Sequence, residues 1–340
     1  MEIKHKKLAL FSLDTPKLFI ALVVFSFLLK KSNNILVYFL TKISNYDRIN
    51  YGDFMKYELF FFKEGNRYLN IEELFNFFDY CPFITVDSTK DEVEAKYVNP
   101  SIELEASFHL TKVSKVPDIH RLDPKYLDLD IYLSIDPMMP MYKVSVILDL
   151  VSDLCQKFDF FTYNILFENV TSFRKELIMK SYEMLREAYR NKFPMEYTSL
   201  NYISKEKAND IFEYLFERKD LEVYCHAENL YFPIPYFIKS QSTGQIYSAV
   251  DLVDDKLFVF PPKTDIVFYK SGEKMHVIYC DELLGTIDKY IYDLPGFIHN
   301  TKVLDKTGMK RIKKIINKTK FTEVTDNFSN IELESIIDFK

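Results

Sequence analysis

Two carboxylates and a lysine follow an apolar strand in the first third of the chain, in the order that metal-dependent nucleases of the restriction type use. Asp87 comes directly after this strand, and Glu94 and Lys96 lie on the next one, separated by a single residue. In such enzymes the two carboxylates bind Mg²⁺, and the lysine stabilises or activates the attacking water. The same segment contains Asp91 and Glu92, which are typical of a solvated turn. The pattern therefore has two interpretations, a metal-dependent hydrolase site and an ordinary charged hairpin.

A thiol and an imidazole are adjacent at Cys225 and His226, and another thiol, Cys280, lies farther along the chain. These side chains can bind zinc, but neighbouring residues on a strand point to opposite faces, and no C-x-x-C pair completes a set of four ligands. We therefore expect no metal site. The four cysteines, which include Cys81 and Cys155, are scattered through a long chain. This usage is typical of a reducing compartment rather than of a disulfide framework.

Tyrosine is abundant, since the chain has 24 Tyr and 31 Phe but no Trp. Phenylalanine is used mainly in hydrophobic cores, whereas tyrosine has a polar hydroxyl group and is enriched at recognition surfaces. Segment 231–237 is held extended by its two prolines, because a residue that precedes proline avoids the helical region. An acidic group follows it, which is interpreted as a solvated turn, with a Ca²⁺ site as the alternative that lacks further spaced ligands. The candidate binding residues are Tyr231, Tyr236, Tyr247, Asp251, Asp254 and Asp255.

The chain has only seven glycines, and no two of them are closer than 11 residues apart. A Walker A loop or a dinucleotide fingerprint needs clustered glycines so that the backbone can approach phosphate. Those nucleotide-binding motifs are therefore excluded, and no cofactor is expected. The net charge of −6 argues against a general nucleic-acid binder. One basic segment, from Lys302 to Lys320, is interpreted as a solvated helix face, with a phosphate-contacting patch as the alternative.

Residues 1–54 differ in charge from the rest of the chain, because they carry a net charge of +4 against −10 for residues 55–340. Basic residues interrupt the apolar stretch 18–40, and each of its runs is shorter than the roughly 20 residues of a membrane-spanning helix. Three interpretations stay open for this N-terminal arm. It is a membrane-associated segment through residues 18–40, a folded helical arm, or an over-called start, in which the start codon is assigned too early and the native protein begins at Met55. The last is favoured because the codons just before Met55 can encode a sequence that resembles a ribosome-binding site.

Residues 55–170 are expected to form an α+β subdomain. Apolar alternation predicts strands and a period of three to four predicts helices, and their order suits an antiparallel sheet with helices on one face. The predicted strands are 57–62, 83–86, 92–97, 102–110, 127–133 and 160–165. The predicted helices are one capped by Asn70 and one over 144–158. A long amphipathic helix over 172–193, within the region 171–200, links this subdomain to the next.

Residues 201–340 are expected to form a second α+β subdomain, also with a mostly antiparallel sheet and helices packed on one face. A weak N-cap at Ser204 predicts a helix that ends near Arg218. The predicted strands of this subdomain are 221–225, 245–250, 257–260, 265–269 and 276–280. Its other predicted helices are 281–290, 308–318 and 332–337. The fold class is therefore α+β with two subdomains.

The spacing of Tyr97, Asn99 and Pro100, then Phe108, then an alternating strand and an apolar helix, resembles a poorly characterised group of bacterial proteins. Proteins of this group are found beside polymorphic toxins and secretion systems. The resemblance covers roughly residues 80–190 and defines no functional residues. It implies a cytosolic immunity protein that binds and neutralises a toxin.

We therefore expect a non-enzymatic, cytoplasmic protein whose partner is another protein, such as a cognate toxin. The acidic body suits this role because many toxin domains are basic nucleases and opposite charges speed association, although an acidic surface also simply keeps a protein soluble. The competing expectations are a metal-dependent nuclease or hydrolase that uses Asp87, Glu94 and Lys96, and a protein that is membrane-associated through residues 18–40. An enzyme would require the three side chains to converge in a cleft.

Overall fold

The computed structural model describes residues 56–65, 69–198, 200–294 and 298–339. The chain is an α+β protein with several sheets, which confirms the predicted fold class. The three interpretations of residues 1–54 lie outside the described residues. Within the described ranges, no helix is both long enough and apolar enough to cross a membrane.

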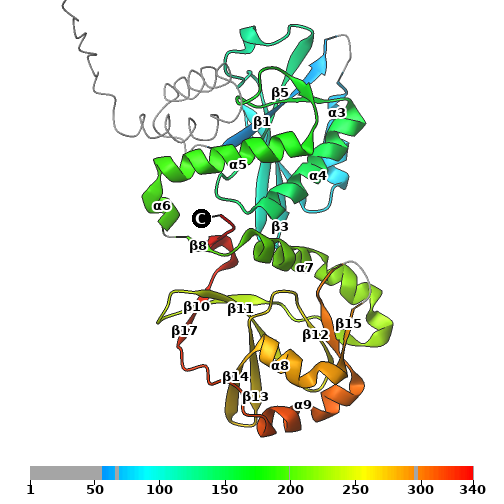
Figure 1. The fold of residues 1–340 in the computed structure, drawn as a ribbon. Helices are drawn as coiled ribbons and strands as arrows, with labels where there is room; N and C mark the ends of the chain where they lie inside the picture. The colour runs from blue at the N-terminus through cyan, green and yellow to red at the C-terminus, as the bar shows by residue number, and fades with distance from the viewer. Residues whose placement is uncertain (1–55, 66–68, 199, 295–297, 340) are drawn as a thin grey trace, which may run out of the picture.

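The first half of the chain builds a seven-stranded sheet in which every neighbouring pair of strands is antiparallel. The strand order is β2-β3-β4-β5-β1-β6-β7. The strands are β1 (Tyr57–Glu64), β2 (Ile84–Ser88), β3 (Glu92–Asn99), β4 (Leu104–Thr111), β5 (Tyr126–Ile135), β6 (Phe161–Tyr163) and β7 (Thr171–Ser172), and a short 3₁₀ helix, η1 (Ile119–Arg121), precedes β5. The helices that pack against this sheet are α3 (Ile71–Tyr80), α4 (Met141–Phe158) and α5 (Lys175–Lys192) (Figure 1).

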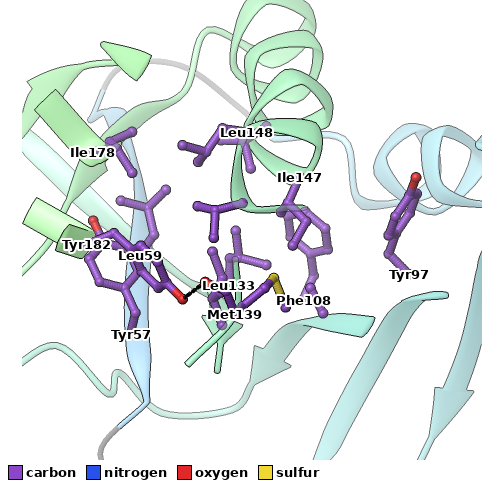
Figure 2. Packing of buried hydrophobic residues seen from close by; sticks show 14 of the residues in the cluster. Tyr57, Leu59, Tyr97, Phe108, Leu133, Met139, Ile147, Leu148, Ile178 and Tyr182 are labelled. Carbon is purple, nitrogen blue, oxygen red and sulfur yellow. Dashed lines mark hydrogen bonds between the residues drawn. The ribbon is translucent and has the colours of Figure 1, made fainter. Parts of the chain in front are cut away.

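Helix α4 illustrates how the sequence produces this packing. Its apolar residues recur every three or four positions, so they form one stripe along the helix. The buried members of the stripe are Val144, Ile147, Leu148, Val151, Leu154 and Phe158. Figure 2 shows Ile147 and Leu148 over Leu133 and Phe108 of the sheet. The predicted helix over 144–158 is confirmed, and it begins three residues earlier than the apolar pattern indicates.

The second half contains a five-stranded and a four-stranded sheet. The five-stranded sheet has the order β14-β13-β11-β10-β17, and only its β11–β13 pair is parallel. Its strands are β10 (Tyr236–Ser240), β11 (Ile246–Leu252), β13 (Ile266–Ser271), β14 (Lys274–Tyr279) and β17 (Phe328–Ile331). The four-stranded sheet is β15 (Ile291–Asp293), β16 (Lys302–Leu304), β12 (Leu257–Phe260) and β9 (Leu230–Tyr231).

Helices cover one side of the five-stranded sheet. The buried residues of α8 (Cys280–Ile287) and α9 (Lys306–Lys318) share a core cluster with Val267 and Ile278. Helix α7 (Lys205–Tyr224) lies between the two halves (Figure 1). The remaining elements are α6 (Pro194–Thr198), the paired strands β8 (Asn201–Tyr202) and β18 (Ile336–Ile337), and the 3₁₀ helices η2 (His226–Glu228), η3 (Asp288–Tyr290) and η4 (Leu333–Ser335).

The predicted strand at 221–225 is wrong, because these residues form the last turn and the C-cap of α7. No proline or glycine separates them from the helix before them. Tyr214 and Leu221 are both buried and lie seven residues apart, which places them on one side of a helix. The Tyr214 hydroxyl also donates a hydrogen bond of 2.9 Å to the Pro233 carbonyl oxygen. Tertiary packing therefore prevails over the strand propensity of a short apolar run.

The predicted helix at 332–337 is also wrong, because only Leu333–Ser335 form a single turn of 3₁₀ helix. Ile336 and Ile337 are extended, and they pair in parallel with Asn201 and Tyr202 of β8. Both isoleucines are buried. Two adjacent β-branched residues suit a strand better than a helix, and here a distant segment supplies the strand partner.

The residues after β18 complete a buried ion pair. Asp338 accepts a hydrogen bond from the Arg186 guanidinium of α5 and another, of 2.8 Å, from the backbone N–H of Met141 at the start of α4. The side chains of Arg186 and Asp338 are 3% and 0% exposed. The Arg186 guanidinium also lies 4.0 Å from the ring centroid of Phe339. The C-terminal segment is thus anchored to two helices of the first half.

Candidate functional site

The pairing of β2 with β3 brings the candidate hydrolase residues onto one surface. Asp87 lies directly opposite Glu94. Opposite residues of an antiparallel pair point to the same face, and Lys96, two residues along β3, shares that face. Buried Ala95 and Tyr97 alternate with them and point to the core. The structure therefore places the three residues together, on the face of the sheet opposite the helices.

Two of the three residues are engaged by the neighbouring strand β4. The Lys96 ammonium lies 2.6 Å from a carboxylate oxygen of Glu105, and this hydrogen bond raises the pKa of Lys96. The Ser107 hydroxyl donates a 2.5 Å hydrogen bond to Glu94. Asp87 is exposed. Within the described part of the chain, no three His, Cys, Asp or Glu side chains are arranged to hold a metal ion. The surface is charged and open to solvent.

The candidate zinc residues are not brought together. Cys225 is buried at the C-terminal end of α7, and His226 beside it is exposed. Cys280 begins α8 in a different core cluster from Cys225. Burial raises the pKa of the Cys280 thiol to about 12 and also raises that of Cys225, so both remain protonated at neutral pH. A protonated thiol is a poor ligand and a poor nucleophile.

The candidate tyrosines Tyr236 and Tyr247 share one face of the five-stranded sheet. Tyr236 lies opposite Ala249 on β11, and Tyr247, two residues from Ala249, has the same orientation. The same register continues onto the neighbouring strands and adds three more aromatic residues. We call this surface the aromatic face, and its members are Tyr236, Tyr247, Phe268, Tyr279 and Phe328.

Ring contacts within the aromatic face reach from β13 to β17, across four of the five strands. The ring centroids of Tyr236 and Phe268 are 6.4 Å apart, those of Phe268 and Phe328 are 6.5 Å apart, and those of Tyr247 and Phe328 are 6.0 Å apart. Phe268 and Phe328 are separated by three strand spacings, or roughly 14 Å in a flat sheet. The sheet must therefore curl toward this face. The rings cover buried Ile238, yet each of them remains partly exposed.

Polar side chains border the aromatic face at Asp251 and Lys270. The Tyr236 hydroxyl donates a hydrogen bond of 3.1 Å to exposed Asp251, and burial together with that carboxylate raises the pKa of Tyr236. Lys270 is exposed on the same side, and Met275, directly opposite it, is 53% exposed. An apolar centre with polar margins is the arrangement found at protein interfaces. In the described chain, the core cluster on this side consists of strand residues alone, whereas α8 and α9 pack on the opposite face.

The other candidate binding residues lie elsewhere. Tyr231 is on β9 of the four-stranded sheet, where the Lys256 ammonium lies 4.7 Å from its ring centroid. Asp254 accepts a hydrogen bond of 2.7 Å from Tyr269 on the helix-covered side, and Asp255 is exposed in the turn before β12. The structure therefore unites Tyr236, Tyr247 and Asp251 and leaves the other three apart.

Lys143 is a buried amine that the sequence pattern did not single out. It lies in the first turn of α4 and is 3% exposed. Its ammonium donates a 2.9 Å hydrogen bond to the Glu103 carbonyl oxygen and lies 4.9 Å from the ring centroid of Phe212 on α7. Burial lowers its pKa to about 8, although the carboxylates of Glu103 and Glu334 partly oppose this shift. Its enclosed position between the first sheet and α7 indicates a role in stability.

Folding stability should depend on pH through Lys143. The folded protein releases this proton near pH 8, whereas the unfolded chain holds it up to a pKa of about 10.4. The unfolded state binds more protons in this window, so the free energy of unfolding rises with pH by at most about 1.4 kcal/mol per unit. In urea unfolding between about pH 7 and pH 10, the difference between the wild type and Lys143→Met should shift in favour of the wild type as pH rises. Parallel pH profiles would contradict this assignment.

Two surface hollows lie in the second half. The first, of about 500 Å³, lies between the start of α7 and the β10–β11 turn, and Lys207 and Lys239 border it. Lys207 is paired with Asp265, and Lys239 donates a 3.2 Å hydrogen bond to Asn201. The second, of about 430 Å³, lies at the N-terminal end of α9. The first is lined by no candidate residue predicted from the sequence, and its lysines are already partnered, whereas the second is bordered by Lys306 of the basic segment.

Sequence reasoning missed Phe268, Tyr279 and Phe328, although these aromatic residues complete the aromatic face. Alternation within segments 265–269 and 276–280 shows which residues share a side of one strand. It does not show which side of one strand aligns with which side of the next, because that depends on register. No protein-family model, curated protein or solved structure matches the chain.

Proposed function

We propose that this chain is a non-enzymatic protein-binding module that holds its partner on the aromatic face. One observation carries the proposal: a curled sheet packs its helices on one side and keeps five partly exposed aromatic rings on the other. Aromatic side chains supply large contact areas at a low cost in conformational entropy, and they dominate the binding energy of interfaces. Their tyrosine hydroxyls can exchange water for hydrogen bonds from the partner.

The proposed partner is a toxin domain, which the chain would neutralise as an immunity protein does. The charge of −10 on residues 55–340 supports a basic partner, because opposite charges accelerate encounter and disfavour wrong partners. Asp251 at the rim of the aromatic face provides a local acceptor for a basic side chain. The gene's neighbouring reading frames are the first place to look for such a toxin.

Charge introduced on the aromatic face should weaken binding. Tyr247 and Met275 lie on this side of the sheet and are at least partly exposed, so Tyr247→Glu with Met275→Glu places two carboxylates in the contact. We expect a loss of about tenfold to 100-fold in affinity for the toxin encoded beside the gene, measured by calorimetry. In cells that express the toxin, the variant should lose protection of growth.

The matched control is Tyr80→Glu with Val113→Glu, since these residues are 87% and 71% exposed in the other half of the chain and the change in net charge is the same. Its affinity and its protection of growth should equal those of the wild type. Urea midpoints establish that all variants are folded. A double variant that is folded and still binds and protects as the wild type does would refute the aromatic face as the contact surface.

A metal-dependent hydrolase is the second candidate, because β2–β3 pairing does place Asp87, Glu94 and Lys96 on one surface. Its test is incubation of the protein with Mg²⁺ or Mn²⁺ and with nucleic acid or phosphodiester substrates. Turnover that is lost in Glu94→Gln would establish an enzyme and overturn the proposed function. Absence of turnover together with toxin binding would favour the module.

A further inference from the structure

Helix α9 presents an unusually basic surface. Its solvent-exposed positions include six Lys or Arg residues and no Asp or Glu. We call this surface the basic face, and its members are Lys306, Lys310, Arg311, Lys313, Lys314 and Lys318. At 1.5 Å per residue, the helix carries these charges along about 20 Å. Each helical turn contributes at least one of them.

The apolar side of α9 packs on the core, which fixes the basic face outward. Ile312 and Ile316 are buried against the residues of α8 and the five-stranded sheet. Gly308 lets the backbone of α9 lie close to the Leu304 and Tyr290 side chains, because a Cβ at this position would be 2.6 and 2.7 Å from their atoms. Met309 and Ile315 are only partly buried, but they belong to the same packed side, so the helix has little apolar surface left with which to enter a membrane.

The lysines of the basic face are not neutralised within the described ranges of the chain, where none of them forms an ion pair. Asp305, the acidic residue nearest to them in sequence, accepts a hydrogen bond of 2.5 Å from the backbone of Gly308 as the N-cap. Arg311 donates a 2.8 Å hydrogen bond to the Tyr290 hydroxyl. A free row of cations on an acidic protein is what a polyanion would recognise.

Lys274 extends the row beyond the end of the helix. Asn317 of α9 donates a hydrogen bond of 3.2 Å to Ser271 in the β13–β14 hairpin. Lys274 lies directly opposite Ser271 in this hairpin and is exposed. The cationic surface therefore spans two elements and does not depend on the helix alone.

We propose that the basic face of α9 docks the phosphate backbone of a nucleic-acid duplex, independently of base sequence. A duplex presents one negative charge per about 1.7 Å of its axis, so a helix of this length meets a continuous line of phosphates. A protein partner would need an apolar contact centre, which the basic face lacks. An anionic membrane would favour an amphipathic helix with an apolar side to bury in lipid, and that side of α9 packs in the core.

The position of α9 reconciles this binding with the acidic body. The helix lies at the end of the second half, far from the seven-stranded sheet (Figure 1). Charges farther apart than the Debye length, about 10 Å at 0.1 M salt, are largely screened. The basic face can therefore attract phosphate locally while the rest of the surface repels it, which favours a single end-on orientation. This inference does not depend on the proposed partner of the aromatic face.

The test measures fluorescence anisotropy of labelled DNA and RNA duplexes of about 24 base pairs, with EDTA present, as salt is raised from about 50 to 200 mM. The basic-face variant carries Lys310→Glu, Lys313→Glu and Lys314→Glu. We expect its affinity to fall at least about tenfold, and the slope of log K against log salt to fall by about three. The matched control carries Lys90→Glu, Lys115→Glu and Lys219→Glu, which are exposed lysines outside α9 with the same change in net charge.

The proposal is supported if the wild type and the control bind either duplex and the basic-face variant does not. Comparison of the two duplexes shows whether DNA or RNA is preferred. Three results would overturn it. They are no binding of either duplex by the wild type at the lowest salt, equal weakening by the control, and binding only to phosphatidylserine vesicles in a parallel sedimentation assay. Urea midpoints confirm that both triple variants are folded.

Discussion

Replacing Asp338 with asparagine should lower the free energy of unfolding by about 3–5 kcal/mol, because it leaves the buried Arg186 charge without a partner. Neither side chain of the pair has more than 3% of its surface exposed, so water cannot solvate the remaining guanidinium. Asparagine keeps the shape of the side chain and can still accept the hydrogen bond from Met141. Urea unfolding followed by circular dichroism measures the loss.

The double variant Arg186→Met with Asp338→Asn separates the lost charge pair from local damage. Removal of both charges should recover much of the stability, since a buried ion pair often contributes little over an apolar replacement. Glu332→Gln is the control in the same segment, because Glu332 is exposed, and it should change stability by less than about 0.5 kcal/mol. If Asp338→Asn costs no more than this control, the ion pair does not anchor the C-terminal segment.

Replacing Phe108 with alanine should also cost about 3–5 kcal/mol, because it opens a cavity in the largest core cluster. Phe108 is fully buried, and its ring centroid lies 5.3 Å from that of Phe78 on α3 and 6.2 Å from that of Phe61 on β1. It therefore joins a helix to two strands of the sheet. The same urea experiment measures the loss.

Tyr80→Ala is the control for this substitution, since it removes an aromatic ring of similar size from the neighbouring α3 at a position that is 87% exposed. It should change stability by roughly 0.5 kcal/mol or less. Similar losses in the two variants would mean that Phe108 does not hold the helix on the sheet. Phe108→Leu should fall between them, because leucine refills part of the cavity.

Local patterns in the sequence predict most elements of this fold. The apolar spacing over 144–158 specifies a helix with one buried side, and the hairpin signal around 98–101 predicts β3 and β4 within two residues of their observed ends. These predictions succeed because backbone periodicity and burial act on neighbouring residues. The strand predicted at 221–225 and the helix predicted at 332–337 fail where distant residues supply the deciding contacts.

The candidate surfaces could be read from the sequence only in part. Alternation places Glu94 and Lys96 on one side of a strand, and the 3.6-residue period gathers the lysines of α9 around Ile312 and Ile316. Tyr236 is a candidate by its residue type and by the extended segment 231–237, and Tyr247 by residue type alone. The sequence alone determines the composition, the charge and the absence of nucleotide-binding glycine clusters. Its apolar patterns also predict the fold class.

Strand register and long-range pairing follow from the folded chain. Register sets Asp87 opposite Glu94, and it aligns Phe268 and Phe328 with the tyrosines so that five rings form one surface. The ion pair between Arg186 and Asp338 joins residues 152 positions apart. Local propensity does not determine such pairings, because many strand registers are compatible with the same alternation of apolar and polar residues. Only the packing of the complete core makes one register the lowest in free energy.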